Sequence, residues 1–508
     1  MNRKRTGFGT RSGFELAAIG SAVGLGNIWG FPYKTSANGG AAYLLVYLLC
    51  ILLVGAVTML AEFGVGRRGK ANPVTAYKSF SPGWGVIGLL TVVIPALIIC
   101  YYYVLGGYTV KYALSSFAGN IGIFSSFAGN TGDVLLHTVI FAALALAIIM
   151  AGVRGGIETS SKILLPSMIV LLIALSSFTL LLGEGVREGL AFYLRPDFHA
   201  ISWAGVLSAM GQAFFSLSLG CGAMITYGSY AGKKINLFRS TAIICLLDAV
   251  ITFMVGLAIF PALFHYVAVT GTAPSELGMG GIGLIFITLP LVFGEMPVIG
   301  QVVSLLFFAM TAIAALTSVV SIVEVVTQFI IQCYRIYRTR AAILVTSICL
   351  ACAVPVAISL GSSLNGGSLL SLFGKNLLDI LDGVTNTILM PLCALAACLA
   401  MGWCSDHSLS GEETPHQNSA LVVMMKFIAP LLIVVIEVFG ITDLLSSPGG
   451  AGTLMCACAV LVITAVAYYG FYRGRDTGSN RDEALLLEQA VEKRKAGLQR
   501  GWYPERDR

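Results

Sequence analysis

Two clusters of glycine, serine and carboxamide residues interrupt long apolar segments of the chain, and these residue types could bind ions. The first runs from Ile19 to Asn27 and contains three glycines, and the second runs from Gln212 to Gly222 and contains two. Glycine destabilises a helix by about 1 kcal/mol relative to alanine, and a backbone group freed in apolar surroundings needs another partner. Freed carbonyls and side-chain oxygens suit a cation, whereas freed N–H groups suit a carboxylate.

The composition indicates that these clusters lie inside a membrane. Of the 508 residues, 57% are hydrophobic and 11% are charged, and the mean hydropathy is +0.86. Soluble domains carry about 25% charged residues, so secreted and cytosolic classes are excluded. The basic residues behind the net charge of +6 are scattered rather than clustered, so no nucleic-acid partner is expected.

Uncharged runs of about 20 residues, the length that spans a bilayer, recur along the whole chain. The runs lack the period-two alternation of barrel strands, so we expect an all-α membrane protein. Its twelve predicted transmembrane helices lie near residues 13–34, 41–67, 87–116, 134–152, 163–183, 201–230, 238–267, 298–332, 341–362, 377–402, 420–441 and 450–472.

The distribution of Lys and Arg predicts the orientation of these spans. Twelve spans place both termini on one side, and a cytoplasmic assignment puts 26 of the 31 basic residues inside, as the positive-inside rule requires. The five outer ones are Lys34, Lys111, Arg187, Arg195 and Lys375. We expect a multi-pass protein of the plasma (inner) membrane with cytoplasmic segments at 1–12 and 473–508.

The two glycine-rich clusters lie five spans apart, in predicted spans one and six. Close helix packing through small residues would explain the glycines without any binding function. However, both clusters also carry Asn, Gln or Ser at mid-membrane depth. Interrupted helices at matching places in two halves indicate the substrate site of a transporter. We therefore expect a transport core over 13–402, built from inverted halves 13–183 and 201–402, with two further spans in 403–472.

The sequence of the first cluster and its flank, Gly20–Tyr33 (GSAVGLGNIWGFPY), is similar to the first-span signature of the neurotransmitter:sodium symporter family. Further similar segments are Phe215–Gly222, Ile225–Tyr227, Leu316–Ser318, and Ile94–Pro95 leading to Tyr101–Tyr102. The resemblance covers roughly residues 5–470 in order. It implies a LeuT-type 5+5 inverted repeat with unwound spans 1 and 6, and sodium-coupled symport by alternating access.

The resemblance also implies two sodium sites. The first would use the Ala22 carbonyl and the side chains of Asn27, Ser216 and Asp248. The second would use the carbonyls of Gly20, Val23 and Ala314 with the hydroxyls of Thr317 and Ser318. The alternative for these two hydroxyls is a hydrogen bond to the carbonyl one turn earlier, which is frequent in membrane helices.

The substrate site implied by the resemblance receives an amino acid or a related small carboxylate or amino-sulfonate. Its carboxylate would meet the N–H groups of Leu25 and Gly26 and the hydroxyl of Tyr102. Its amine and side chain would meet Ala22, Ile98, Phe215, Ser218, Cys221, Ser318 and Ile322. Monoamine transporters have an aspartate where Gly24 stands, so Gly24 leaves room for the substrate's own carboxylate. Cys221 replaces an aromatic wall residue, so leucine is not expected to be the best substrate.

The gates depart from the family pattern. The usual arginine before Phe31 is replaced by Gly30, so Lys34 would either pair with Asp382 instead or face the outer vestibule. At the inner side Arg5 is present, but its usual acidic partner aligns with Gln332.

Chloride-dependent members of the family bind the anion through residues that resemble Tyr47, Gln212 and Ser216, and through a serine where Thr252 stands here. Asp248 stands where the family has an asparagine, and its carboxylate could supply the negative charge that two buried sodium ions require. We therefore expect transport without a chloride requirement. A protonated Asp248 with chloride still bound is the alternative.

Other carboxylates and other functions complete the expectations. Glu62, one turn before Arg67 and Arg68, predicts a structural ion pair, and Glu324 could line the inward exit path. Rival functions are a proton-coupled or exchange transporter of the same fold and a non-transporting membrane sensor. We find no nucleophile–base pair, so an enzyme is not expected. The protein would work in the lipid bilayer as a monomer or homodimer.

Overall fold

The computed structural model describes residues 7–119, 124–232, 234–271, 283–296, 299–364, 367–404 and 419–472. Arg5 and the tail 473–508 lie outside these residues. Helices dominate the described residues, which contain no β-strand and a single isolated β-bridge between Leu372 and Lys375.

Helices account for nearly all of the regular structure. The α-helices of the first half are α1 (Arg11–Ala22), α2 (Phe31–Ala37), α3 (Ala41–Cys50), α4 (Ala56–Gly69), α5 (Pro73–Lys78), α6 (Gly85–Phe117), α7 (Phe124–Gly129), α8 (Thr131–Met150), α9 (Thr159–Leu180) and α10 (Val186–Leu194). Those of the second half are α11 (Trp203–Ser216), α12 (Ala223–Tyr230), α13 (Leu237–Thr270), α14 (Leu289–Gly294), α15 (Ile299–Tyr334), α16 (Arg338–Leu364), α17 (Leu377–Asp382), α18 (Met390–Trp403), α19 (Ser419–Val423), α20 (Ala429–Ser446) and α21 (Gly450–Ala467). π-Helical turns lie at Gly26–Gly30, Ile51–Gly55, Val153–Glu158, Leu284–Thr288, Gly383–Leu389, Met424–Ile428 and Tyr468–Tyr472, and a 3-10 turn lies at Pro82–Trp84.

Ten helical segments of the described residues are long and apolar enough to cross a membrane. They are Ala41–Gly69, Pro82–Phe117, Thr131–Met150, Val153–Leu180, Leu237–Thr270, Ile299–Tyr334, Arg338–Ser363, Leu377–Trp403, Leu421–Ser446 and Gly450–Tyr472. Each overlaps one predicted span, and most ends differ by a few residues. The largest difference is the segment starting at Val153, because Lys162 pairs with Glu158 at 2.7 Å inside the helix instead of ending it.

The predicted spans 13–34 and 201–230 are each divided between shorter helices. In the first, α1 ends at Ala22, Val23 is extended (φ −77°, ψ 100°), and a π-helical turn leads into α2. In the second, α11 ends at Ser216 and α12 begins at Ala223. Gly220 between them has φ +82°, and an added Cβ would lie 2.1 Å from the Met390 carbonyl oxygen, so this break requires glycine.

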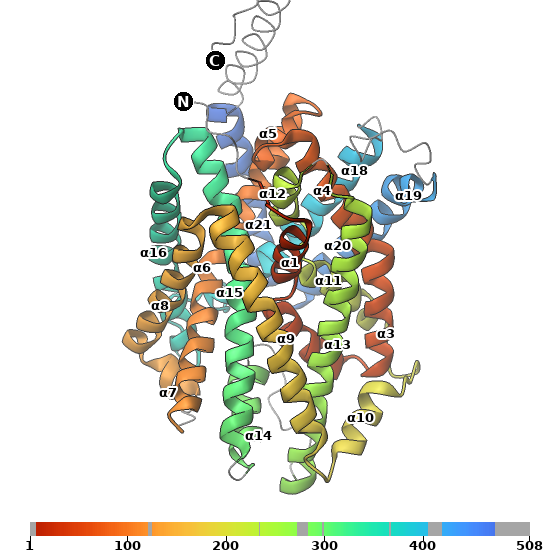
Figure 1. Cartoon of the computed structure of the whole chain (residues 1–508), viewed down its shortest axis with the longest axis vertical. Helices are drawn as coiled ribbons and strands as arrows, with labels where there is room; N and C mark the ends of the chain where they lie inside the picture. The colour runs from red at the N-terminus through yellow and green to blue at the C-terminus, as the bar shows by residue number, and fades with distance from the viewer. Residues whose placement is uncertain are drawn as a thin grey trace, which may run out of the picture.

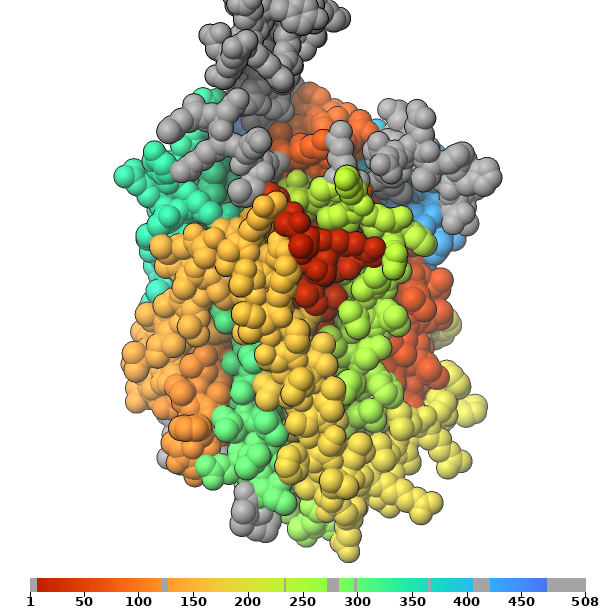
Figure 2. Space-filling view, in the orientation of Figure 1, coloured from red at the N-terminus to blue at the C-terminus, as the bar shows by residue number. Residues whose placement is uncertain are grey.

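The helices run side by side along the long axis of the molecule, with α5 and α12 toward one end and α7, α10 and α14 toward the other (Figure 1). The divided segment that begins with α1 lies among α9, α13 and α15, with which α1 makes contacts. On one face, α1 reaches the surface between α9 and α13 (Figure 2). This arrangement places the break after α1 inside the bundle, where Val23, Leu25 and Asn27 are buried.

Candidate functional site

The backbone groups freed at the first break find side-chain partners. The Gly24 N–H donates to Asn27 Oδ1 at 3.1 Å, and the Leu25 N–H donates to the Tyr102 hydroxyl at 3.3 Å. Tyr102 comes from α6, which is 77 residues away in sequence from Leu25. The break is therefore held by specific polar contacts inside the bundle, as an interrupted helix in apolar surroundings requires.

A fully buried polar group, which we call the Asp248 cluster, joins both breaks to α3 and α13. It consists of Asn27, Tyr47, Ser216, Asp248 and Thr252, and each has 0% of its surface exposed. The Asp248 carboxylate accepts from Asn27 Nδ2 and Ser216 Oγ, both at 2.8 Å, and from the Tyr47 hydroxyl at 3.3 Å. Asn27 Nδ2 also lies 2.8 Å from Ser216 Oγ and 2.7 Å from Thr252 Oγ1.

The structure thus brings together three side chains predicted for the first sodium site and three predicted for the anion site, with Ser216 in both. Gln212, the fourth residue of the predicted anion site, makes a different contact. Its Nε2 donates to the Gly26 carbonyl at 2.8 Å, and its Oε1 has no hydrogen-bond partner among the described residues. An added Cβ on Gly30 would lie 3.1 Å from that oxygen, so Gln212 fills the space beside Gly30.

A second polar group lies where α15 crosses the end of α1. Ser318 Oγ lies 3.2 Å from the Gly20 carbonyl, 3.1 Å from that of Ser21 and 3.3 Å from that of Val23. These carbonyls belong to the last turn of α1 and to the residue after it, where no following helical N–H is available to all of them. Ser318 therefore faces a set of converging carbonyl oxygens across the helix interface.

Thr317 behaves differently from Ser318. Its Oγ1 lies 3.0 Å from the Ala314 carbonyl and 3.2 Å from the Ile313 carbonyl, so it bonds to its own helix. It still touches α1, because an added Cβ on Gly20 would lie 3.2 Å from the Thr317 Cβ. Four of the five residues predicted for the second sodium site, Gly20, Val23, Thr317 and Ser318, therefore meet at this interface, and the Ala314 carbonyl accepts from Thr317.

A cavity of about 40 Å³ lies between the two polar groups. Its lining residues are Ser21, Ala22, Gly24, Gly26, Ile98, Tyr102, Phe215, Ser218, Cys221, Ser318, Ile322 and Met390. Every residue predicted for the substrate site is among them except Leu25, whose N–H bonds to Tyr102. Ser21 and Met390 were missed, since neither has a distinctive residue type in its segment.

The cavity in this conformation is close to the size of one water molecule, whose share of liquid volume is about 30 Å³. An added Cβ on Gly24 would lie 2.4 Å from Ser318 Oγ and 3.0 Å from the Tyr102 hydroxyl. Position 24 therefore has no room for a larger side chain. Any organic solute that enters must first move the surrounding helices or the Phe215 ring apart.

Phe215 lines both this cavity and a larger one of about 560 Å³. Lys34 and Asp382 both line the larger cavity. Among the described residues no ion pair joins these two, and the Asp382 carboxylate instead accepts from the Asn386 amide. The structure thus places the two predicted gate residues in the lining of one cavity without an ion pair between them among the described residues.

At the opposite end, a buried ion pair joins α15 to α16 and α12. Glu324 has 0% exposure, and its Oε1 accepts from the Tyr230 hydroxyl at 2.6 Å and from Arg338 Nη1 at 3.0 Å. Arg338 Nη2 contacts Glu324 Oε2 at 2.5 Å. Gln332 accepts from the backbone and side chain of Asn72 at 2.8 and 2.7 Å, so it ties α15 to the start of α5.

The predicted ion pair between Glu62 and its neighbouring arginines is wrong. Glu62 Oε1 accepts from the Gly220 N–H at 2.6 Å, in the middle of the second break. Arg67 instead donates to the Ile235 carbonyl at 2.6 Å, and Arg68 lies over the Phe80 ring. Leaving the buried Gly220 N–H without an acceptor would cost more free energy than the loss of an ion pair between Glu62 and an arginine at the surface.

Glu158 holds the start of α1 and was not singled out from the sequence. Its carboxylate accepts from the Gly9 N–H, the Thr10 hydroxyl and Lys162 Nζ, each at 2.7 Å. Thr10 is also the N-cap of α1, accepting from the Gly13 N–H. Glu158 lies between Arg154 and Lys162 in the short polar segment that separates two predicted spans, and its backbone partner Gly9 lies 149 residues away.

Interrupted helices that meet at a buried cavity inside a bundle of membrane-spanning helices are typical of secondary transporters. The sequence model described as the sodium:neurotransmitter symporter family matches residues 5–126 and 123–454. The chain therefore belongs to this family, and the resemblance inferred from the sequence is confirmed. It is a membrane transporter rather than an enzyme.

Individual relatives agree with this assignment. The chain is 33% identical over 454 residues to an uncharacterized sodium-dependent transporter of Bacillus subtilis, covering 85% of this chain and 97% of that protein. It is 26% identical to the mouse sodium- and chloride-dependent neutral and basic amino acid transporter B(0+), covering 64% and 62%. Among solved structures, MhsT in complex with L-phenylalanine is 37% identical, with a TM-score of 0.76 over 86% of this chain and 100% of that one.

Proposed function

We propose that this protein is a sodium-coupled symporter of an amino acid or a related small carboxylate or amino-sulfonate, working by alternating access. The observation that carries the proposal is the meeting of both helix breaks at one small cavity between the Asp248 cluster and Ser318. The structure of a relative with bound L-phenylalanine supports an amino-acid substrate. The divided segments count as spans one and six of twelve, related by a LeuT-type inverted repeat, with both termini in the cytoplasm.

Two sodium ions would bind on either side of the cavity. The first is proposed at the Asp248 cluster, with Asn27, Ser216 and the Ala22 carbonyl. The second is proposed where the Gly20, Val23 and Ala314 carbonyls meet Thr317 and Ser318. The hydroxyl hydrogen bonds now made to these carbonyls mark oxygens close enough together to share a small cation.

The substrate carboxylate would bind at the first break. The Leu25 N–H donates to the Tyr102 hydroxyl at 3.3 Å, so the two groups lie close enough together for one carboxylate to accept from both. They lie at the start of the helical turn Gly26–Gly30, where helix N–H groups favour an anion. Ser218 is held against the Ser21 carbonyl at 2.8 Å, which leaves nearby carbonyls for the amine.

Chloride would not be required. The hydroxyl donors that resemble a chloride site, Tyr47 and Ser216, already donate to the Asp248 carboxylate. The Gln212 amide is directed to Gly26. A fixed carboxylate therefore occupies the place at which an anion would otherwise compensate the sodium charge.

The energetics permit strong accumulation. A tenfold sodium gradient and a 100 mV potential supply about 1.4 and 2.3 kcal/mol per ion, so two ions supply roughly 7 kcal/mol. This could sustain a gradient of about 10⁵ for a zwitterion. Release inside would follow opening of the second sodium site, with the inner gate at Arg5 and the outer one at Lys34 and Asp382.

Uptake by the purified full-length protein in liposomes tests the proposal. A panel of amino acids and small amino-sulfonates is offered under an inward sodium gradient, with potassium replacing sodium as the control. Sodium-dependent uptake of at least one amino acid is expected. Binding without uptake would favour a sensor instead.

A proton-coupled transporter is the second candidate, and the buried Asp248 carboxylate is the observation that favours it. A proton gradient imposed without sodium separates the two candidates. Uptake under that condition, at the level seen with sodium, would overturn the sodium coupling.

A further inference from the structure

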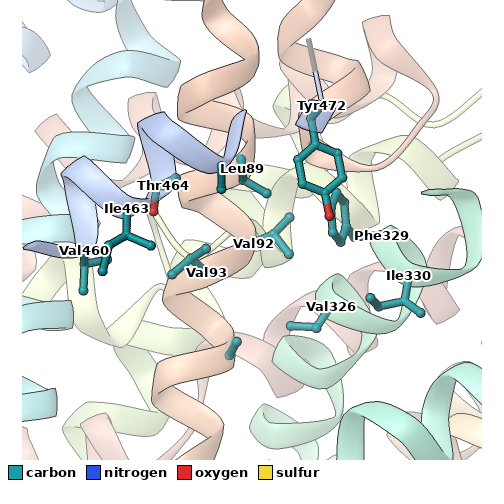
Figure 3. A pocket seen from close by; sticks show the side chains of 12 residues that line it. Leu89, Val92, Val93, Val326, Phe329, Ile330, Val460, Ile463, Thr464 and Tyr472 are labelled. Atoms are coloured by element: carbon teal, nitrogen blue, oxygen red, sulfur yellow. The ribbon is translucent and has the colours of Figure 1, made fainter. Parts of the chain in front are cut away.

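A third cavity, which is apolar and has a volume of about 350 Å³, lies between α6, α15 and α21 and shares no residue with the proposed substrate cavity. Side chains from the three helices face a common space, among them Val93, Val326 and Ile463 (Figure 3). The volume lies in the range of pockets that bind small molecules, about 300–1,000 Å³. Thr464 and Tyr472 are the only lining residues with a polar side-chain atom, so water would find few partners there.

The length of the cavity matches one leaflet of a bilayer. Its lining runs along α21 and the turn after it from Val460 to Tyr472, which is about 18 Å of helix. Half of the hydrocarbon core of a bilayer is about 15 Å thick. Ile463 lines the cavity yet is 66% exposed on the outer face of the bundle, so the mouth opens sideways toward lipid.

The rim at the Tyr472 end carries aromatic and basic groups. The rings of Phe329 and Tyr472 lie 5.6 Å apart, and the hydroxyls of Tyr334 and Tyr472 lie 3.3 Å apart. Lys78 Nζ donates to the Tyr472 carbonyl at 2.8 Å. Arg335 follows Tyr334 and is exposed. Under the proposed orientation this rim faces the cytoplasm, where anionic lipid headgroups attract Lys and Arg.

We propose that the cavity binds one acyl chain of an anionic phospholipid from the cytoplasmic leaflet, with its headgroup against Arg335 and Lys78. The apolar lining, the sideways mouth and the one-leaflet length fit an acyl chain. The basic rim at the headgroup level supplies the charge complementarity. The orientation rests on the proposed function, but binding is measured without sodium or substrate, so its outcome is independent of transport.

The test is native mass spectrometry of the full-length protein in detergent, titrated with dioleoyl phosphatidylglycerol or dioleoyl phosphatidylcholine. The wild type is expected to retain one phosphatidylglycerol and to prefer it over phosphatidylcholine. Ile463→Trp fills the mouth and should lose this lipid, whereas Val462→Trp, at an exposed neighbour that does not line the cavity, should keep it. Equal melting temperatures of the two variants without lipid show that both fold.

A second pair of variants, one test and one control, examines the contact with the lipid headgroup. Arg335→Ala is expected to weaken phosphatidylglycerol binding about fivefold, the effect of one basic residue near an anionic headgroup. Arg340→Ala should leave it unchanged, because Arg340 lies over the Tyr337 ring. Equal binding of the two lipids by the wild type, or equal lipid retention by both tryptophan variants, would overturn the proposal. So would a lipid-free dimer that Ile463→Trp converts to monomer, because a second copy would then cover this face.

Discussion

Asp248 joins the two ion-binding functions that the sequence suggested for its neighbourhood. Its carboxylate accepts hydrogen bonds from Asn27 in the first break, from Ser216 at the end of α11 and from Tyr47 on α3. A buried carboxylate with these donors is stabilised by hydrogen bonds, and a nearby cation stabilises it further. One residue can therefore replace a bound anion and still serve as a sodium ligand.

Replacing chloride with gluconate is therefore expected to leave wild-type uptake unchanged. Asp248→Asn removes the fixed charge and frees the Tyr47 and Ser216 hydroxyls, so uptake should become chloride-dependent or cease. Asp379→Asn, an equal change in the larger cavity that Lys34 and Asp382 also line, should remain chloride-independent. Loss of wild-type uptake in gluconate would contradict the role assigned to Asp248.

Cys221 is one of the residues that line the proposed substrate cavity. It is buried in the wall, and its Sγ contacts the Ser218 carbonyl at 3.1 Å. Cys221→Phe overfills this wall, and overpacking is worth about 1–3 kcal/mol. Binding of amino acids with large side chains should therefore fall tenfold or more, with glycine and alanine affected least. The measurement is competition binding across an amino-acid panel.

The control for this change is Cys221→Ser, which keeps the size of the side chain and should keep the substrate range. The same panel tests the expectation that leucine is not the preferred substrate of the wild type. Leucine as the tightest wild-type ligand would contradict the expectation that Cys221, in place of an aromatic residue, shifts the preference away from leucine.

At the scale of elements, the two helix breaks depend on acceptors and donors brought from other helices. Tyr102 on α6 accepts a hydrogen bond from the Leu25 N–H, and Glu62 on α4 accepts one from the Gly220 N–H. Without these partners, buried backbone groups would remain unpaired. The breaks are thus a property of the assembled bundle rather than of α1 and α11 alone.

Glu62→Ala is expected to destabilise the protein by about 1–3 kcal/mol, because the Gly220 N–H would lose its acceptor. Glu62→Gln keeps an acceptor oxygen and should lie close to the wild type. Glu437→Ala is the control, since Oε2 of that carboxylate has no hydrogen-bond partner among the described residues. Thermal unfolding in detergent measures all three. Equal melting temperatures for Glu62→Ala and Glu62→Gln would show that Glu62 does not support the break.

Local patterns in the sequence were enough to place most elements. Uncharged run length located the ten long helices, and glycines located the breaks near Gly24 and Gly220, because both properties are local. Run length could not locate α10 or α14, which are too short to span a membrane.

Contacts between distant residues could not be predicted in the same way. The partner of Glu62 lies 158 residues away, so the neighbouring arginines looked closer than the true acceptor. Resemblance supplied the residues around the cavity, but it could not distinguish Ser318, which faces α1, from Thr317, which bonds to its own helix. Such distinctions depend on side-chain rotamers and helix rotation.

At the scale of the whole molecule, α1 connects the cavity to the end of the bundle that we propose to be cytoplasmic. Its last turn supplies the carbonyls that face Ser318, and its first turn is held by Glu158. A movement of α1 away from α15 would separate Gly20 and Val23 from Ser318 and open the proposed second sodium site. Glu158 opposes that movement from the far end of the same helix, so it should favour the sodium-binding conformation.

Glu158→Ala should therefore weaken sodium binding although Glu158 touches neither proposed sodium site. A coupling of 1–3 kcal/mol predicts an increase of about fivefold or more in the sodium concentration that half-saturates substrate binding. Glu158→Gln retains acceptors for Gly9 and Thr10 and should show a smaller increase. Glu188→Ala, at an exposed carboxylate on α10, should show none. The measurement is equilibrium substrate binding against sodium concentration in detergent. If Glu158→Ala binds sodium as tightly as Glu188→Ala, the tether of α1 does not control the second site, because the carbonyls of Gly20 and Val23 would have stayed against Ser318 without it.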